Sequence, residues 1–176
     1  MGMSIDLATL EFISFLNSEG ELDSRFDGKV GVYAIFDAKK ILQYVGYSRD
    51  VSLSLKQHLV RCPQQCYWIK VQTIDRPSRT VLEEIRAAWM AENGSIPPGN
   101  AADELRWTQA IDAKMQLTPE ERSAFAAGDE LMQMKLLKQA ARRVEADVMA
   151  QLEARGVNMQ IRFNPKLKEN GLLDLK

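Results

Sequence analysis

Hydrophobic and polar positions in the first part of the chain change their period several times, which predicts a mixture of strands and helices. Two apolar runs, residues 30–36 and 41–47, alternate with the period of two that is typical of strands. Only residues 37–40 separate them, so we expect a hairpin with a tight polar turn. A third run, residues 66–74, is rich in aromatic and β-branched residues and predicts a third strand.

Three other segments carry apolar side chains three or four positions apart. Residues 4–18, 48–59 and 79–93 are therefore each expected to form an amphipathic helix. Ser48 is expected to cap the second of these helices, and Gly94 to end the third. The order of the elements predicts an α+β fold, in which a small antiparallel three-stranded sheet is flanked by helices.

The chain after Asn100 has a different composition, dense in Ala, Glu, Lys, Arg, Leu and Met, and predicts a helical C-terminal extension. Thr118 and the Pro-Glu-Glu that follows it are typical of a helix start. A long helix is expected over residues 129–155, with an apolar stripe from Leu137 to Leu152. Residues 157–163 are expected to form a short strand.

These elements suggest three parts. Residues 1–28 would hold the N-terminal helix and a connection, residues 29–100 the α+β domain, and residues 101–176 the helical extension. A three-stranded domain of about 70 residues has a thin core. We therefore expect the extension to pack on the domain and the whole chain to form one compact unit.

Composition and charge restrict the classes of function. The chain has 176 residues and a net charge of −1. No apolar stretch approaches the roughly 18 residues of a membrane span, and no secretion signal is recognisable, so a cytoplasmic protein without membrane contact is expected. Two cysteines exclude a disulfide scaffold. The mildly acidic pI of about 5.9 argues against a dedicated DNA clamp and leaves room for a local basic patch.

The hairpin carries the most informative motifs. Residues 31–33 read Gly-Val-Tyr, residues 44–46 read Tyr-Val-Gly, and an amphipathic helix follows. This pattern resembles the signature of GIY-YIG nucleases, a family that cuts DNA phosphodiesters with a divalent metal ion. The resemblance covers residues 29–100. It implies a hydrolase that takes DNA as its partner and Mg²⁺ or Mn²⁺ as its cofactor.

The resemblance also assigns roles to residues of the two motifs. Tyr33 and Tyr44 would line one shared cleft, where a tyrosine orients or deprotonates the attacking water. Gly31, Gly46 and Asn100 match the family's glycines and closing asparagine and would lie near the substrate. A tyrosine with its ordinary pKa of about 10 is a poor base unless a neighbouring cation lowers that value.

Two charged residues of the family pattern are replaced. Ser54 stands where the phosphate-binding arginine is expected, and Arg86 where the metal-binding glutamate is expected. Loss of one preorganised stabiliser typically lowers the rate by about 10²–10³. The resemblance therefore implies DNA binding, with metal-dependent hydrolysis weak at best.

Other side chains are candidates for the missing roles. His58, the only histidine, stands where several members of the family carry histidine and is a candidate catalytic residue. Arg49 and Lys56 are candidates for binding phosphate. Glu83 is the best available metal ligand, shifted by one turn from Arg86.

A narrower resemblance rests on residues 31–34, 43–49, 58–59 and 96–100 together with Cys66. These residues look like the nuclease-like N-terminal domain of plant chloroplast monothiol glutaredoxins, which also lacks the usual arginine and to which activity on DNA has been attributed. The tail has no cysteine, so it is not expected to hold the glutaredoxin domain that follows the nuclease-like domain in those proteins. The resemblance thus implies a stand-alone relative from a photosynthetic lineage such as the cyanobacteria.

Two alternatives to action on DNA remain open. In the first alternative, the protein is a non-catalytic module that binds a protein partner through the sheet face or the helical extension. The replacements at Ser54 and Arg86 favour this alternative. A thiol-based regulator would use Cys66, alone or in a bridge with Cys62.

Overall fold

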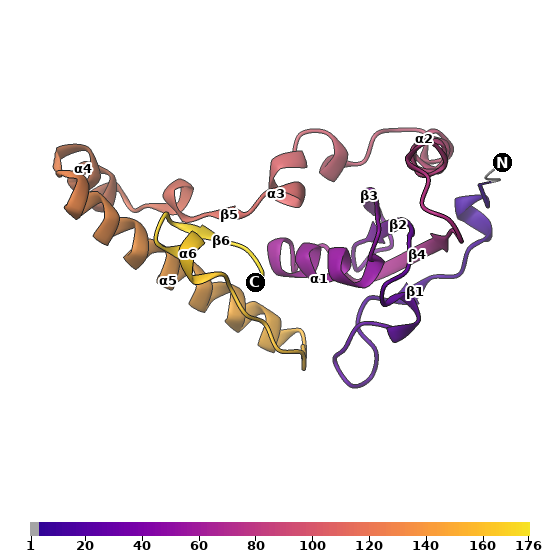
Figure 1. The fold of residues 1–176 in the computed structure, drawn as a ribbon, viewed down its shortest axis with the longest axis horizontal. Helices are drawn as coiled ribbons and strands as arrows, with labels where there is room; N and C mark the ends of the chain where they lie inside the picture. Colours follow the sequence, from indigo (N-terminus) through magenta and orange to yellow (C-terminus); the bar gives the residue numbers. More distant parts are fainter. Residues whose placement is uncertain (1–3) are drawn as a thin grey trace. The chain divides into compact units, whose positions relative to one another are not determined.

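The computed structural model describes residues 4–176, and the chain divides into two compact units, Met1–Thr108 and Gln109–Lys176 (Figure 1). The division lies beyond residue 100, where the sequence suggested the end of the α+β domain. The expected packing of the extension on that domain stays a prediction.

The first unit is built on a four-stranded antiparallel sheet with the strand order β1-β4-β2-β3. Its strands are β1 (Ile13–Ser14), β2 (Gly31–Phe36), β3 (Leu42–Ser48) and β4 (Trp68–Thr73). The hairpin of β2 and β3 is confirmed. The three expected strands form the sheet, and the two-residue β1 adds a fourth at its edge.

The helix expected over residues 4–18 is wrong. This segment holds only the 3-10 turn η1 (Leu7–Thr9) and β1. The backbone amide of Leu7 donates to the Glu92 carboxylate at 2.8 Å, and its carbonyl accepts from Lys70 Nζ at 2.9 Å. These long-range contacts fix Leu7 in the 3-10 turn, and the segment continues into β1 instead of a helix.

Two helices cover opposite faces of the sheet. Because side chains alternate along a strand, Val32, Ala34 and Val45 face α2 (Arg79–Asn93), while Tyr33 and Tyr44 face α1 (Val51–Arg61). Figure 1 shows the strands between the two helices. On the α2 side, the buried core adds the three helix residues Leu82, Ile85 and Trp89.

Both helices begin and end at local signals. The bounds of α2 are those predicted, and Gly94 ends it with φ of 84°. Ser48 does not cap α1: the Asp50 side chain accepts from the Leu53 amide at 3.3 Å, so α1 begins later than expected. The remaining elements of the first unit are η2 (Ser24–Phe26), η3 (Pro98–Asn100) and α3 (Glu104–Thr108).

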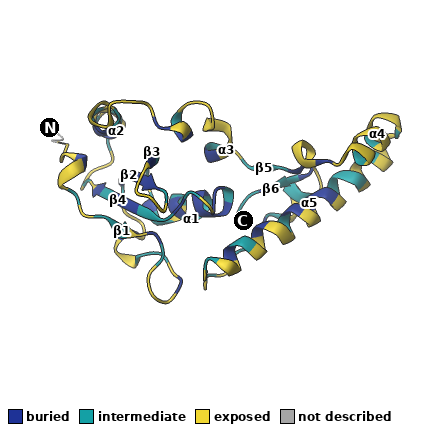
Figure 2. Cartoon of the chain, turned by 180° about the vertical axis from the view of Figure 1, so that it is seen from behind, coloured by how far each residue is buried: buried dark blue, intermediate teal, exposed yellow. Residues whose placement is uncertain are grey.

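The second unit is mostly helical, as expected. Its elements are β5 (Ile111–Asp112), η4 (Ala113–Gln116), α4 (Pro119–Ala127), α5 (Glu130–Ala154), α6 (Pro165–Lys168) and β6 (Leu172–Leu173). Thr118 and Glu121 form the capping box that starts α4. Figure 2 shows buried and exposed residues alternating along α5, whose buried stripe includes Ala141, Val144 and Val148.

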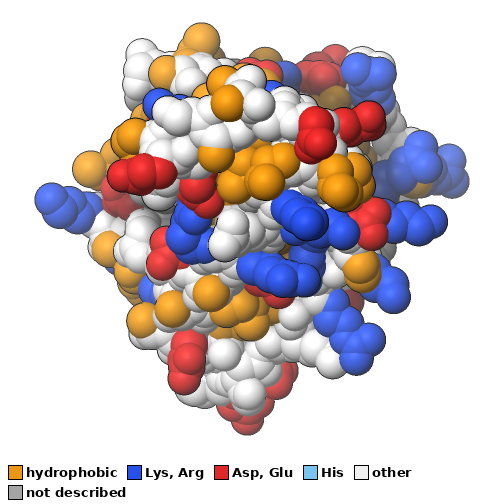
Figure 3. Space-filling view, turned by 90° about the vertical axis from the view of Figure 1, so that its left-hand side faces the viewer, with side chains coloured by type: hydrophobic (Ala, Val, Ile, Leu, Met, Phe, Trp, Pro, Cys, Tyr) orange, Lys and Arg blue, Asp and Glu red, His pale blue; other side chains and the backbone are white. Residues whose placement is uncertain are grey.

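The strand expected at residues 157–163 is wrong. Phe163 forms only an isolated bridge with Leu175, and β5 pairs with β6 instead. Among residues 4–176, no helix is both long and apolar enough to cross a membrane. Figure 3 shows Lys and Arg side chains gathered on part of one face, among hydrophobic and acidic side chains.

Candidate functional site

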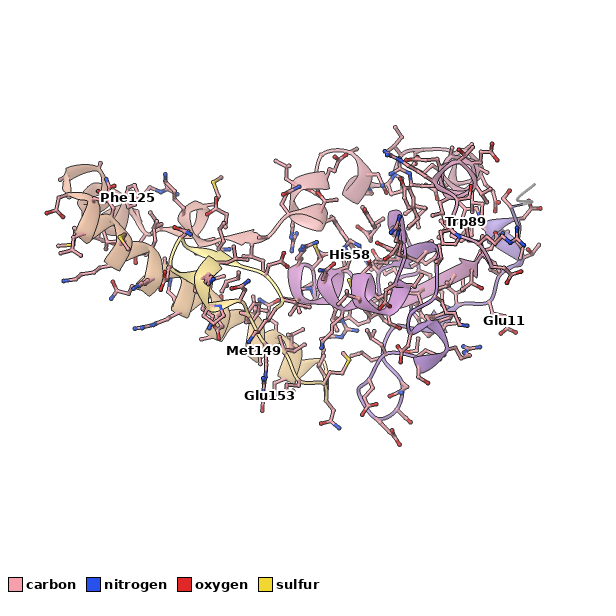
Figure 4. All side chains as sticks on the ribbon, in the orientation of Figure 1. Glu11, His58, Trp89, Phe125, Met149 and Glu153 are labelled. Atoms are coloured by element: carbon pink, nitrogen blue, oxygen red, sulfur yellow. The ribbon has the colours of Figure 1, made fainter. Side chains whose placement is uncertain are left out.

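Two phenols and the single imidazole meet on the α1 side of the sheet. The ring centroids of Tyr33 and Tyr44 are 6.2 Å apart, and those of Tyr44 and His58 are 4.7 Å apart. The Tyr33 hydroxyl and His58 Nε2 are hydrogen-bonded at 2.7 Å. Figure 4 shows His58 projecting from α1. Both phenols therefore lie on one face of the sheet, as the strand alternation predicts. We call Tyr33, Tyr44 and His58 the tyrosine–histidine cluster.

The two motif glycines allow close packing. A Cβ on Gly46 would lie 2.6 Å from Tyr44 Cε2 and 2.8 Å from the Tyr33 hydroxyl oxygen. A Cβ on Gly31 would lie 2.6 Å from the backbone oxygen of Gln72 on β4. Gly46 thus makes room for the phenols, and Gly31 for the neighbouring strand.

The tyrosine–histidine cluster is sealed from solvent, so the expected position at the mouth of a cleft is wrong. The exposed fractions are 2% for Tyr33, 8% for Tyr44 and 4% for His58. The ring of Trp107, from α3, stacks on that of Tyr44 with an interplanar angle of 3° and a centroid distance of 5.3 Å. Trp107 is itself only 2% exposed. Asn100 bonds to the backbone of β3 rather than facing an open site.

Burial sets the protonation states of the cluster. Desolvation raises the pKa values of Tyr33 and Tyr44, and for Tyr44 the charges of Arg86 and Arg61 only partly oppose this rise. Desolvation, followed by the charge of Arg61, lowers the pKa of His58 to about 3. At neutral pH the phenols are therefore protonated and the imidazole is neutral, which leaves no phenolate to act as a base.

Glu83 belongs to a different group of side chains, on α2. Its Oε1 accepts from the Tyr47 hydroxyl at 2.6 Å, and its Oε2 accepts from Arg86 Nη2 at 3.1 Å. The bond from Tyr47, followed by the charges of Arg86 and Arg79, lowers the pKa of Glu83. Both carboxylate oxygens are therefore already engaged.

A preformed metal site does not emerge from these side chains. Within residues 4–176, no three His, Cys, Asp or Glu side chains gather in a group able to hold a metal ion. The predicted ligand Glu83 is paired with a cation, Arg86. The residues present thus do not fit a protein-held Mg²⁺ or Mn²⁺, which prefers several oxygen ligands in octahedral geometry.

A pocket of about 420 Å³ opens where β3 ends and α2 begins. Its lining residues are Val30, Tyr47, Ser48, Arg49, Pro77, Ser78, Arg79 and Leu82. Arg49 and Arg79 are exposed, and the Ser78 side chain caps α2 by accepting from the Val81 amide. The start of this 15-residue helix adds partial positive charge. The pocket is suited to an anion. Of the two predicted phosphate ligands, Arg49 lines it, whereas Lys56 lies half-buried on α1.

Both thiols are buried, and no disulfide joins Cys62 to Cys66. Desolvation raises the pKa of Cys62 to about 12, so this side chain stays a thiol at neutral pH. Its Sγ lies 4.0 Å from the carbonyl of Arg106. Cys66 is fully buried as well, so an oxidant would have to enter the interior to reach it.

Three side chains of these sites were missed by sequence reasoning. Trp107 lies beyond residue 100, where the sequence predicts the α+β domain to end, and the spacing around Arg79 predicts only the start of a helix. Tyr47 directly follows the second motif, and its alternation with Tyr44 places it on the other face of the sheet. A signal was present for Arg79, because it follows the cap Ser78 at the first position of α2, where an anion is favoured.

Comparison with known proteins relates the chain to GIY-YIG-like, nuclease-related domains. The chain is similar to bifunctional monothiol glutaredoxin-S16, chloroplastic, of Arabidopsis thaliana, with 33% identity over 96 residues. The N-terminal part of that protein is a GIY-YIG-like domain. The match covers 51% of this chain and 33% of the relative, so the homology is distant and extends over a third of the relative's length. No family model matches the chain.

Proposed function

We propose that the first unit binds the phosphate groups of DNA at the pocket between β3 and α2, and that hydrolysis is at most a minor activity. The observation that carries this proposal is the placement of Arg49 and Arg79 around one pocket at the start of α2. The distant relationship to a nuclease-like domain supports DNA as the source of the phosphates.

The chemistry of the pocket favours a phosphodiester. A guanidinium offers a planar fork of donors that matches two phosphate oxygens, and it stays charged at any physiological pH. Arg49 and Arg79 would supply two such forks, and the first backbone amides of α2 would supply further donors. The volume of about 420 Å³ falls in the range of small-ligand pockets.

The same structure disfavours efficient cutting. The phenols of Tyr33 and Tyr44 are protonated and buried, and Glu83 is engaged by Tyr47 and Arg86. A buried tyrosine with a raised pKa neither activates water nor contacts a phosphate. The proposal therefore includes binding and positioning of DNA and no metal-dependent step.

Binding is tested with a fluorescently labelled DNA duplex by anisotropy over a series of salt concentrations. The affinity should fall steeply with salt, and each of Arg49→Gln and Arg79→Gln should reduce the slope of log K against log[salt] by about 1. Arg25→Gln is a matched control, because Arg25 is exposed, pairs with Asp23 and does not line the pocket. Unchanged affinity in both pocket variants, or no salt-dependent binding, contradicts the proposal.

Cutting is tested separately with supercoiled plasmid and Mg²⁺ or Mn²⁺. We expect the unaltered protein to nick the plasmid little faster than the Arg49→Gln, Arg79→Gln double variant does. Rapid nicking that Tyr33→Phe or Tyr44→Phe abolishes would show that the tyrosine–histidine cluster is catalytic and would overturn the second half of the proposal. Rapid nicking that survives both substitutions would indicate a contaminating nuclease.

A further inference from the structure

The segment after α2 lies over the tyrosine–histidine cluster. Residues 101–106 are all exposed, whereas Trp107 turns inward against the rings of Tyr44 and His58. Its indole ring is 5.3 Å from the Tyr44 ring and 5.6 Å from the His58 ring, measured between centroids. One inward side chain thus separates the cluster from solvent on this side.

Few polar contacts hold this segment. At its start, the Asn100 side chain accepts from the Val45 amide and donates to the Val45 carbonyl, both at 2.8 Å. At its end, Arg61 Nη1 donates to the carbonyl of Trp107 at 3.1 Å. Between these points, α3 has only five residues. A helix that short is not stable without tertiary support, so the segment depends on Trp107 and its two anchored ends.

The start of the segment, at Gly99 and Asn100, packs tightly against β3. A movement of the segment would therefore begin after these two residues. A Cβ on Gly99 would lie 2.5 Å from the carbonyl oxygen of Gln43 and 2.9 Å from Trp107 Cδ1. Asn100 follows directly and is fixed to β3. After Asn100, the Asp103 amide donates to the carbonyl of Pro98 at 2.9 Å. The segment meets α1 only near its end, where Cys62 Sγ lies 4.0 Å from the Arg106 carbonyl and Arg61 donates to the Trp107 carbonyl.

We propose that residues 101–108 form a cover that lifts from the tyrosine–histidine cluster as one piece, while the sheet and both large helices stay folded. Local openings of this kind require far less free energy than global unfolding when the moving piece makes few buried contacts. Lifting the cover removes Trp107 from Tyr44 and His58 and admits solvent to both. The inference goes beyond the proposed function and does not depend on DNA binding at the pocket.

Opening would change the chemistry of the cluster. Burial is the main cause that lowers the pKa of His58 and raises that of Tyr44, so solvent access returns both toward their ordinary values. An imidazole with a pKa near 6.5 is suited to proton transfer at neutral pH. In the closed state the His58 imidazole is therefore inaccessible to solvent, and in the open state it is accessible beside the two phenols.

The sole histidine makes the opening measurable. The full chain is treated with diethyl pyrocarbonate at neutral pH and increasing urea, all below the unfolding transition, and the adduct on His58 is followed by peptide mass spectrometry. A lifting cover exposes little surface, so the modification rate should depend only weakly on urea. A rate that follows the full urea dependence of global unfolding overturns the proposal.

Variants give an independent test. Trp107→Ala should accelerate modification of His58 by about tenfold or more, because the covering ring is gone while the sheet remains. Arg61→Gln, which frees the Trp107 carbonyl, should accelerate it less. Leu105→Ala is the matched control on α3, since Leu105 is 74% exposed and should leave the rate unchanged. A folded Trp107→Ala protein whose His58 stays unreactive contradicts the cover. Should Trp107→Ala fail to fold, the urea dependence of the unaltered chain decides the question.

Discussion

The hydroxyl of Tyr33 and Nε2 of His58 satisfy each other across 2.7 Å in an interior where neither has ready access to water. The hydroxyl of Ser54 also interacts with this phenol. Removing one member of a buried pair leaves the other without a partner, and this loss costs about 1–3 kcal/mol. Tyr33→Phe should therefore lower the free energy of unfolding by that amount in urea denaturation.

Tyr44→Phe is the matched control for that substitution. It removes a hydroxyl from a similarly buried ring, whose contacts with His58 and Trp107 are made between ring faces. Its effect on the free energy of unfolding should be clearly smaller. Equal effects of the two substitutions would show that the bond between Tyr33 and His58 adds nothing to stability.

The stability of the first unit should rise with pH between about 3 and 6.5 because of His58. Its pKa is about 3 in the folded protein, against an ordinary value of 6.5 in the unfolded chain. Between these pH values His58 is protonated in the unfolded state and neutral in the folded state. Its contribution to stability is therefore fully present above pH 6.5 and is lost as the pH falls. The slope approaches about 1.4 kcal/mol per pH unit.

Urea unfolding from pH 5 to pH 7 measures this slope with little interference, because the chain has one histidine and ordinary carboxyl groups titrate lower. His58→Gln should abolish most of the slope in that window. A slope that persists in this variant would assign the pH dependence to other groups.

Gly46→Ala should disrupt the arrangement of the two phenols. The added methyl group would lie 2.6 Å from a ring carbon of Tyr44 and 2.8 Å from the Tyr33 hydroxyl oxygen, so a ring has to move. Overpacking of this kind typically costs about 1–3 kcal/mol. Urea denaturation measures the loss, and a second substitution, Tyr44→Leu, should recover part of it by making room. Failure of the second substitution to recover any stability would place the clash elsewhere.

Lys40 combines an unfavourable backbone with a favourable side chain. Its φ of 63° is in the left-handed region, which disfavours residues other than glycine by about 1 kcal/mol. Its Nζ lies 4.8 Å from the ring centroids of both Phe12 and Trp68, and each such contact contributes about 0.5–1 kcal/mol at an exposed site.

Substitutions at Lys40 separate the two effects. Lys40→Met loses the cation and keeps the strain, so urea denaturation should show it to be the least stable protein of the series. Lys40→Gly loses both and should lie close to the unaltered protein. A Lys40→Met protein as stable as the unaltered one would contradict the role of the two aromatic rings.

The elements with strong local signals could be predicted from the sequence. The apolar stripe of α2 lies between the cap Ser78 and the terminal Gly94, so its bounds follow from its own residues. Residues 4–18 carry a helical spacing too, but Glu92 and Lys70, more than 60 positions away, bind Leu7 in a 3-10 turn and the segment forms no α-helix. Periodicity contains no information about such contacts.

The candidate sites likewise combine features that follow from local sequence patterns with features that depend on tertiary packing. Alternation along two paired strands was enough to bring Tyr33 and Tyr44 together. Their burial depends on Trp107, which follows a loop and a short helix that carry no periodic signal. The pocket depends on how the end of β3 meets the start of α2, and only packing of the helix on the sheet determines that juxtaposition.

The side chain of Asn100 imitates a peptide group. It gives one hydrogen bond to Val45 and receives one from it, which is the exchange that a residue on a neighbouring strand would make. β3 is the outermost strand on its side of the sheet, and unpaired outer strands recruit strands from other molecules. The Asn100 side chain thus occupies the backbone groups in the middle of this edge strand and protects the protein against intermolecular β-pairing.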